Sequence, residues 1–393
     1  MNRKNEKKTA FPANAGRAFG DYIKHMSCKA VSEAFQRKAN LFYTFKHTAG
    51  ILFLMFVCMF FFSGCGDTAP KEANDRAADL LAEGKYAAAT KAYQENIENG
   101  YFPAEAYRGI GLAQMAEGEY ADACISLERS LLAVDKQSPE FVRDVRLYLA
   151  WCRWMHGERD RAIEIYSEML LTDPEPEVLF LRGRLYMEKG MEEEAARDFA
   201  RAAAETDDIR IFINIYRVYA DYEMNADGSS YLEKALDFAG DAPENALDRA
   251  LVKFYLQNYT DARTEVFTAL EADPENVEAK FLLGRIYLAL GDTPNARATY
   301  REYVGNLPVA ARAYAGLLAC DLMEKNTDEA RKDLTAAMEL PGAEKNRDLR
   351  FYEILLYEYR HDWVTARRKA AAFVLDFPTD EEGLRENAFL ASR

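Results

Sequence analysis

A short acidic stretch in the middle of the chain has the residue types of the first half of a calcium loop. It reads EMNADGS over residues 223–229, so that oxygen-bearing side chains alternate and a glycine follows them. Calcium takes oxygen ligands at alternating positions of such a loop. The loop's twelfth position, however, holds Lys234 instead of a bidentate glutamate. The stretch therefore favours a plain turn between two helices, and a calcium site is the weaker alternative.

Motifs for other metal sites and for nucleophilic catalysis are missing from the sequence. No H-E-x-x-H, C-x-x-C or G-x-S-x-G occurs, and no S-x-x-K follows Cys65. Gly109 and Gly111 have the spacing of a dinucleotide loop, but no strand pattern precedes them. We therefore expect a protein that is not an enzyme and that holds no metal and no cofactor.

The apolar run at residues 51–62 ends abruptly at the sequence FSGC, which closes with Cys65. Such a run is shorter than the roughly 20 residues of a membrane-spanning helix and suits the core of an export signal. FSGC resembles the lipobox of bacterial lipoproteins, although Phe62 stands where that family usually has leucine. The resemblance implies a leader at residues 1–64, a lipid on Cys65, and a lipoprotein anchored in the bacterial cell envelope, facing the periplasm or the outside. An uncleaved signal anchor is the alternative.

The leader is longer than an export signal requires. An internal start, at Met26 or near Leu41, would leave a signal of normal length, so we expect the assigned start to be wrong and the true signal to occupy about residues 41–64. Residues 1–64 hold ten Lys/Arg and three Asp/Glu, so the remainder has 40 basic and 62 acidic residues and a net charge of −22. This charge repels phosphate backbones and anionic lipid headgroups. We therefore expect no nucleic-acid partner, and we expect the lipid alone to hold the chain at the membrane.

Three further cysteines follow Cys65, at positions 124, 152 and 320. An odd number of widely spaced thiols is not a disulfide framework. All three lie in apolar helical patterns, where a free cysteine behaves as a small buried hydrophobic residue. Whether any two of them pair stays open.

One unit recurs along the chain: a glycine, then an alanine, then an aromatic residue, with proline closing the unit. It is seen as Gly157, Ala162, Tyr166 and Pro174, and again as Gly291, Ala296, Tyr300 and Pro308. The alanine suits a point where two helices cross closely, and the aromatic residue fills the space between helix pairs. Glycine gives the positive φ of a helix end, and proline cannot continue a helix.

These residues resemble the tetratricopeptide repeat, a helix-turn-helix unit. The resemblance implies an all-α, right-handed superhelical solenoid of about nine repeats over residues 71–378. Residues 65–70 would then be the lipidated cysteine with a short linker, and residues 379–393 a C-terminal capping helix. Unit five is degenerate, with Gly228 at the crossing and Glu223 at the turn, and unit six has Gln257 at its turn. The crossing positions are Ala89, Ala123, Ala162, Ala195, Gly228, Ala262, Ala296, Ala330 and Ala366.

In this family the first helix of each pair lines the concave groove, where ligands usually bind. Aromatic rings interleaved with arginine are the residue types in which binding energy concentrates. Carried over position by position, the groove residues are Trp151, Trp154, Phe180, Arg184, Arg217, Phe254, Phe281, Arg285, Phe351 and Tyr359. The lysine-asparagine clamp with which some members bind chaperone ends is missing, because the matching places hold Asn74, Arg108 and Leu112.

The sequence thus predicts a membrane-anchored, non-catalytic scaffold that binds a protein or peptide partner in its groove, within a cell-envelope complex. The alternative is a surface capture protein for glycan or peptidoglycan fragments. Trp151 and Trp154 would stack on sugar faces in that case. The identity of the partner and the type of envelope do not follow from the sequence.

Overall fold

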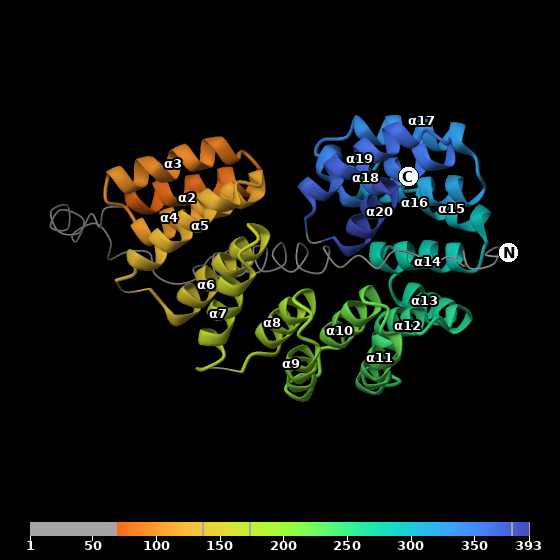
Figure 1. The fold of residues 1–393 in the computed structure, drawn as a ribbon, viewed down its shortest axis with the longest axis horizontal. Helices are drawn as coiled ribbons and strands as arrows, with labels where there is room; N and C mark the ends of the chain where they lie inside the picture. Colours follow the sequence, from red (N-terminus) through yellow and green to blue (C-terminus); the bar gives the residue numbers. More distant parts are fainter. Residues whose placement is uncertain (1–68, 136, 173, 379, 393) are drawn as a thin grey trace, which may run out of the picture. The chain divides into compact units, whose positions relative to one another are not determined.

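The computed structural model describes residues 69–392, apart from residues 136, 173 and 379. The leader, the apolar run and Cys65 lie outside the described residues. The described chain divides into two compact units, residues 69–198 and residues 199–392. Figure 1 shows α-helices running back and forth in pairs along each unit. None of the described helices is long and apolar enough to cross a membrane.

The N-terminal unit consists of antiparallel helices in chain order. They are α2 (Ala69–Ala82), α3 (Tyr86–Glu98), α4 (Pro103–Glu117), α5 (Tyr120–Leu132), α6 (Pro139–Met155), α7 (Arg159–Met169) and α8 (Pro176–Glu188). Helix α9 (Glu192–Ala204) contains the boundary between the units.

The C-terminal unit continues the same alternation. Its α-helices are α10 (Ile209–Asp221), α11 (Asn225–Ala239), α12 (Ala246–Tyr255), α13 (Tyr259–Ala272), α14 (Val277–Ala289), α15 (Thr293–Arg301), α16 (Leu307–Met323), α17 (Thr327–Met338), α18 (Arg347–Tyr359), α19 (Trp363–Asp376) and α20 (Glu381–Ala391). Two short 3₁₀ turns, η1 (Pro243–Asn245) and η2 (Ala343–Lys345), precede α12 and α18.

The helices form nine consecutive pairs, from α2 with α3 to α18 with α19, and α20 follows the last pair. We call the even-numbered member of each pair its first helix. The eight alanines predicted at the helix crossings are all fully buried, on the second helices. At the remaining crossing, in the fifth pair, a Cβ on Gly228 would lie 3.3 Å from the Cα of Tyr216. The all-α stack of about nine repeats predicted from these small residues is confirmed.

The turn inside each pair requires a left-handed residue. Glycine supplies it in several pairs, for example Gly157 with φ 87° and Gly291 with φ 77°. In other pairs a non-glycine residue occupies the same turn position. Glu223 (φ 62°), Gln257 (φ 61°) and Lys325 (φ 59°) adopt the positive φ there. The predicted turns of the degenerate units are therefore present, although such residues adopt this conformation at an energetic cost.

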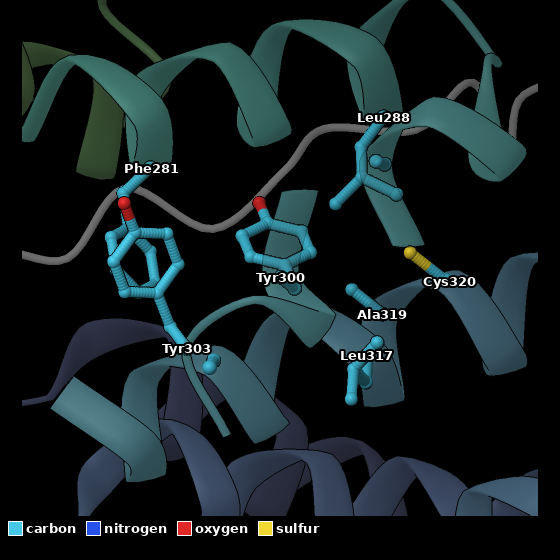
Figure 2. Close-up of a cluster of buried hydrophobic side chains, with 9 residues drawn as sticks. Phe281, Leu288, Tyr300, Tyr303, Leu317, Ala319 and Cys320 are labelled. Carbon is cyan, nitrogen blue, oxygen red and sulfur yellow. The ribbon is translucent and has the colours of Figure 1, made fainter. Parts of the chain in front are cut away.

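Aromatic side chains fill the space between successive pairs, as Figure 2 shows for the cluster around Tyr300. The Tyr300 ring lies between two glycines, so that a Cβ on Gly284 would be 2.6 Å from it and a Cβ on Gly316 2.5 Å. Cys320 belongs to the same cluster. Cys124, Cys152 and Cys320 are all buried, as predicted, and all three are free thiols, which the sequence had left open.

Candidate partner-binding face

The ten residues predicted to line a groove all lie on first helices. Trp151 and Trp154 are on α6, Phe180 and Arg184 on α8, Arg217 on α10, Phe254 on α12, Phe281 and Arg285 on α14, and Phe351 and Tyr359 on α18. We call the side formed by these helices the first-helix face. Since the described chain divides into two compact units, the first-helix face of each unit is described by itself.

In the N-terminal unit, Trp154 and Arg184 belong to one closed cluster. The Arg184 guanidinium lies 4.7 Å from the centre of the Trp154 ring, and Trp154 Nε1 donates a hydrogen bond to Glu188 at 2.9 Å. Arg159 Nε donates to the same Glu188 carboxylate at 2.9 Å. Only 2% of the Trp154 surface is exposed. The cluster joins α6, α7 and α8, so these side chains stabilise the repeat stack.

The neighbouring aromatic residues of this unit are more open. Trp151 and Phe180 are both half-buried. The Trp151 ring packs edge-to-face against Tyr120, with the ring centres 5.5 Å apart. Trp151 and Trp154 therefore do not present two exposed indole faces side by side.

In the C-terminal unit, arginines also lie over rings of the preceding repeat. The Arg285 guanidinium is 4.4 Å from the centre of the Phe254 ring and 5.8 Å from that of Tyr255. Arg312 is 4.2 Å from the centre of the Phe281 ring. Each pair joins neighbouring first helices and is a favourable cation–π contact.

Sequence reasoning missed Arg312 as a member of this series. The signal was present, because each of these arginines follows its ring by 30 or 31 positions, close to the length of one repeat. Glu188, which holds Trp154, was also missed. A glutamate on a helix carries no comparable signal in the sequence.

The remaining aromatic residues differ widely in exposure. Phe281 and Phe351 are almost completely buried in the clusters between repeats, so their rings act mainly in packing. The Arg347 guanidinium lies 4.6 Å from the centre of the Phe351 ring. Tyr359, at the end of α18, is 47% exposed and is the most accessible residue of the predicted set.

Arg217 differs from the other buried arginines of the described chain, which are Arg184 and Arg249. Arg249 pairs with Glu265 and also donates to the carbonyl oxygens of Gly240 and Ala242. Arg217 is 8% exposed, and its Nε and Nη2 have no hydrogen-bond partner among the described residues. The guanidinium is thus removed from water without a counter-charge in the described part of the chain.

The stretch considered for calcium forms the turn into α11. Glu223 has the left-handed turn conformation, and helix α11 begins at Asn225. The side chains after Asn225 therefore follow a helix. Among the described residues no group of three or more His, Cys, Asp or Glu side chains is placed to hold a metal ion.

A match to a protein-family model supports the repeat assignment. A tetratricopeptide repeat model matches residues 74–140, 147–208 and 247–311. A crystal structure of a tetratricopeptide repeat protein from Parabacteroides merdae covers 68% of this chain and 98% of its own, with 16% identity and a TM-score of 0.41. The Pseudomonas aeruginosa pilF structure covers 52% of this chain and 92% of its own, with 24% identity and a TM-score of 0.33.

A curated relative is the DnaJ homolog subfamily C member 7 homolog of Schizosaccharomyces pombe. It is 24% identical over 260 residues, which are 62% of this chain and 48% of the relative. The chain thus spans about half the length of that relative. The repeat match and the nine helix pairs together define a tetratricopeptide repeat protein, the class of scaffold that mediates protein interactions.

Proposed function

We propose that this protein is a lipid-anchored scaffold of the bacterial cell envelope, which binds a protein or peptide partner on its first-helix face. The observation that carries the proposal is that arginines on first helices lie over aromatic rings of the preceding repeat, as Arg184 does in the N-terminal unit and Arg285 and Arg312 do in the C-terminal unit. Stacking on rings of the preceding repeat fixes their positions at a low entropic cost. Rigid arginines and aromatic rings are the groups that dominate binding energy at protein interfaces.

The proposed anchor is a lipid on Cys65, which the sequence FSGC supports. Several acyl chains on one cysteine would give durable attachment, whereas a single chain gives only marginal binding. Mass spectrometry of the N-terminal peptide tests the anchor, with Cys65→Ser as the control variant. We expect a diacylglyceryl mass on Cys65 and none in the variant. An unmodified Cys65 would refute this part of the proposal.

In-cell crosslinking followed by affinity purification tests the binding face. Arg184, Arg217 and Arg285 are changed together to glutamate in the full chain. The matched control is Arg331→Glu, since Arg331 is exposed and lies on the second helix α17. We expect the triple variant to lose its crosslinked partners while the control keeps them. Unchanged partners in the triple variant would contradict the proposed face, provided that its circular-dichroism melt matches the control.

The structure gives the alternative glycan function less support. Sugar recognition by stacking needs an accessible ring face, and Trp154 is buried beneath Arg184. Tryptophan fluorescence with muropeptides distinguishes the functions, because only direct glycan binding beside Trp151 would shift the emission. We expect no shift.

A further inference from the structure

One edge of the N-terminal unit presents apolar side chains to solvent. Because the helices alternate in direction, the starts of the first helices and the ends of the second helices lie at one edge, which we call the inter-pair edge. Phe102, between α3 and α4, is 41% exposed. Leu132 at the end of α5 is 86% exposed, and Leu171, between α7 and α8, is 84% exposed. Each of three successive connections between pairs thus carries a large exposed apolar side chain.

The opposite edge of this unit contains the turns inside the pairs and consists mostly of glycine and charged residues. These turns read EGK, GE, HGE and KGM over residues 83–85, 118–119, 156–158 and 189–191. Among the described residues of the unit, the only other large apolar side chain that is exposed is Ile125, within α5. Single exposed apolar residues are common, but a group of them confined to one edge indicates an interaction surface.

The chain leaves toward the proposed lipid from this same edge. Helix α2 is a first helix, so its start at Ala69 belongs to the inter-pair edge. Only residues 66–68 separate Ala69 from Cys65, and four residue steps span at most about 14 Å. Helix α2 has 14 residues and is therefore about 21 Å long, which places the opposite edge that much farther away. A lipid on Cys65 would hold the inter-pair edge, and not the opposite one, next to the membrane surface.

We propose that the inter-pair edge of the N-terminal unit docks on a neutral lipid bilayer, with the side chains of Phe102, Leu132 and Leu171 inserted between the headgroups. This inference rests on the proposed lipid on Cys65. Transfer of large apolar side chains out of water is favourable, and the boundary between headgroups and acyl chains accepts such groups to a depth of about 5–10 Å. The lipid remains the anchor, and the apolar edge orients the unit that the lipid holds. Because the contact uses helix ends, it leaves the first-helix face of this unit uncovered for a partner.

The charges at this edge select the kind of lipid surface. Glu98 ends α3, Asp135 follows α5 and Glu168 lies next to the end of α7, and all three are exposed. Exposed basic side chains such as Lys71 and Arg129 also lie there, but acidic residues outnumber basic ones along the edge. Carboxylates are repelled by anionic headgroups, whereas a zwitterionic headgroup offers them an ammonium group. The edge therefore favours phosphatidylethanolamine or phosphatidylcholine over phosphatidylglycerol.

Fluorescence quenching in vesicles tests the docked edge. The mature lipidated chain is labelled with bimane at Thr172→Cys or at Glu119→Cys and reconstituted in phosphatidylcholine vesicles that contain doxyl-labelled lipid. Both positions are exposed, Thr172 beside Leu171 and Glu119 in a turn of the opposite edge. The three described native thiols are buried and escape labelling. We expect the doxyl lipid to quench the label at position 172 and not the label at position 119.

Leucine substitutions show whether the apolar side chains cause the contact. Leu132→Ser together with Leu171→Ser removes two of the inserted groups. Ile125→Ser is the matched control, because it replaces an exposed apolar residue in the middle of α5. Each leucine favours the inserted edge by about tenfold or more, so the double variant should lose most of the quenching at position 172 while the control keeps it. Phosphatidylglycerol in place of part of the phosphatidylcholine should weaken the quenching.

The outcomes separate this inference from the proposed function. Undiminished quenching in the leucine double variant, or equal quenching at positions 172 and 119, overturns the docked edge while the lipid on Cys65 and the partner-binding face stand. Stronger quenching in vesicles with phosphatidylglycerol overturns the preference for a neutral lipid surface. A mass spectrum without lipid on Cys65 overturns the proposed anchor and this inference with it. Because both leucines are exposed, the thermal melt of the double variant should match that of the wild type.

Discussion

Arg385 on α20 donates a hydrogen bond from Nη1 to the backbone carbonyl oxygen of Asp221, at 2.6 Å, although 164 positions separate the two residues. Next to it, Tyr222 Oη lies 3.4 Å from the carboxylate of Glu381. The last helix of the C-terminal unit therefore contacts the end of α10, the helix that carries Arg217. The C-terminal unit is thus linked both through neighbouring repeats and by this long-range contact.

Removal of this link should loosen the turn between α10 and α11. Arg385→Ala takes away a hydrogen bond at an exposed site, so we expect a loss of only about 0.5–1 kcal/mol in local stability. Hydrogen exchange of the amides at residues 221–224 measures the effect, and faster exchange there is the expected result. Exchange at the turn around Gly291, in the same unit, serves as the internal reference. Unchanged exchange at residues 221–224 would show that the Arg385 contact contributes nothing in solution.

Replacement of the unpaired buried arginine should stabilise the protein. Arg217→Met removes a buried charge without a described partner, so we expect the free energy of unfolding to rise by about 1–3 kcal/mol. Arg249→Met should instead lower it by about 3–5 kcal/mol, because Glu265 loses its partner and the carbonyl oxygens of Gly240 and Ala242 lose a donor. Urea unfolding of the two variants gives the comparison. Similar losses in both would indicate that Arg217 has a structural counter-charge in solution.

The Tyr300 ring leaves no room for a methyl group on either side. Gly284→Ala and Gly316→Ala each place a Cβ within 2.6 Å of this ring, so we expect each to destabilise the protein by about 1–3 kcal/mol. Gly305→Ala is the matched control, since nothing lies within 4 Å of its added Cβ. Thermal unfolding should show a lower Tm for the first two variants and an unchanged Tm for the third. A normal Tm for Gly316→Ala would argue against this packing.

Glycine at position 325, in the turn between α16 and α17, should give the protein a higher free energy of unfolding than the native lysine. Lys325 has a φ of 59°, which is unfavourable for a residue with a Cβ. We expect Lys325→Gly to stabilise the protein by up to about 1 kcal/mol, partly offset by the greater freedom of glycine in the unfolded chain. The reverse change, Gly291→Ala, should destabilise it because Gly291 has a φ of 77°. Equilibrium urea unfolding of the two variants should therefore give shifts of opposite sign.

The thiol of Cys320 should be unreactive in the folded protein. Burial raises its pKa to about 12, and the nearby Arg297 lowers it only in part. At pH 8 the thiol is therefore protonated, and it reacts slowly with iodoacetamide until the chain unfolds. Because the folded pKa lies above the unfolded one, this group stabilises the fold fully below about pH 9 and loses that effect as the pH rises toward 12. Peptide mapping after alkylation at pH 8, with and without urea, checks the expectation, and rapid labelling without urea would contradict it.

Local residue types were sufficient to predict the helix pairs and their number. Small residues at a regular interval permit close helix crossings, and the structure places these alanines at fully buried positions. The turn of unit five was predicted as degenerate from Glu223, and the backbone there still adopts a positive φ. Packing of the two helices imposes that conformation in spite of the side chain, which is why the fold tolerates departures from the repeat pattern.

The sequence by itself determined the all-α repeat architecture, because the helix periodicity, the crossing alanines and the turn positions act over short distances along the chain. It also placed the candidate arginines on first helices, because the repeat pattern shows which residues belong to the first helix of each pair. Only the tertiary structure decided which of them have counter-charges. Arg312 faces Glu278 and Arg249 faces Glu265, whereas Arg217 faces no described carboxylate. Ion pairs depend on distances between side chains of different helices, and these distances are fixed only when the repeats pack.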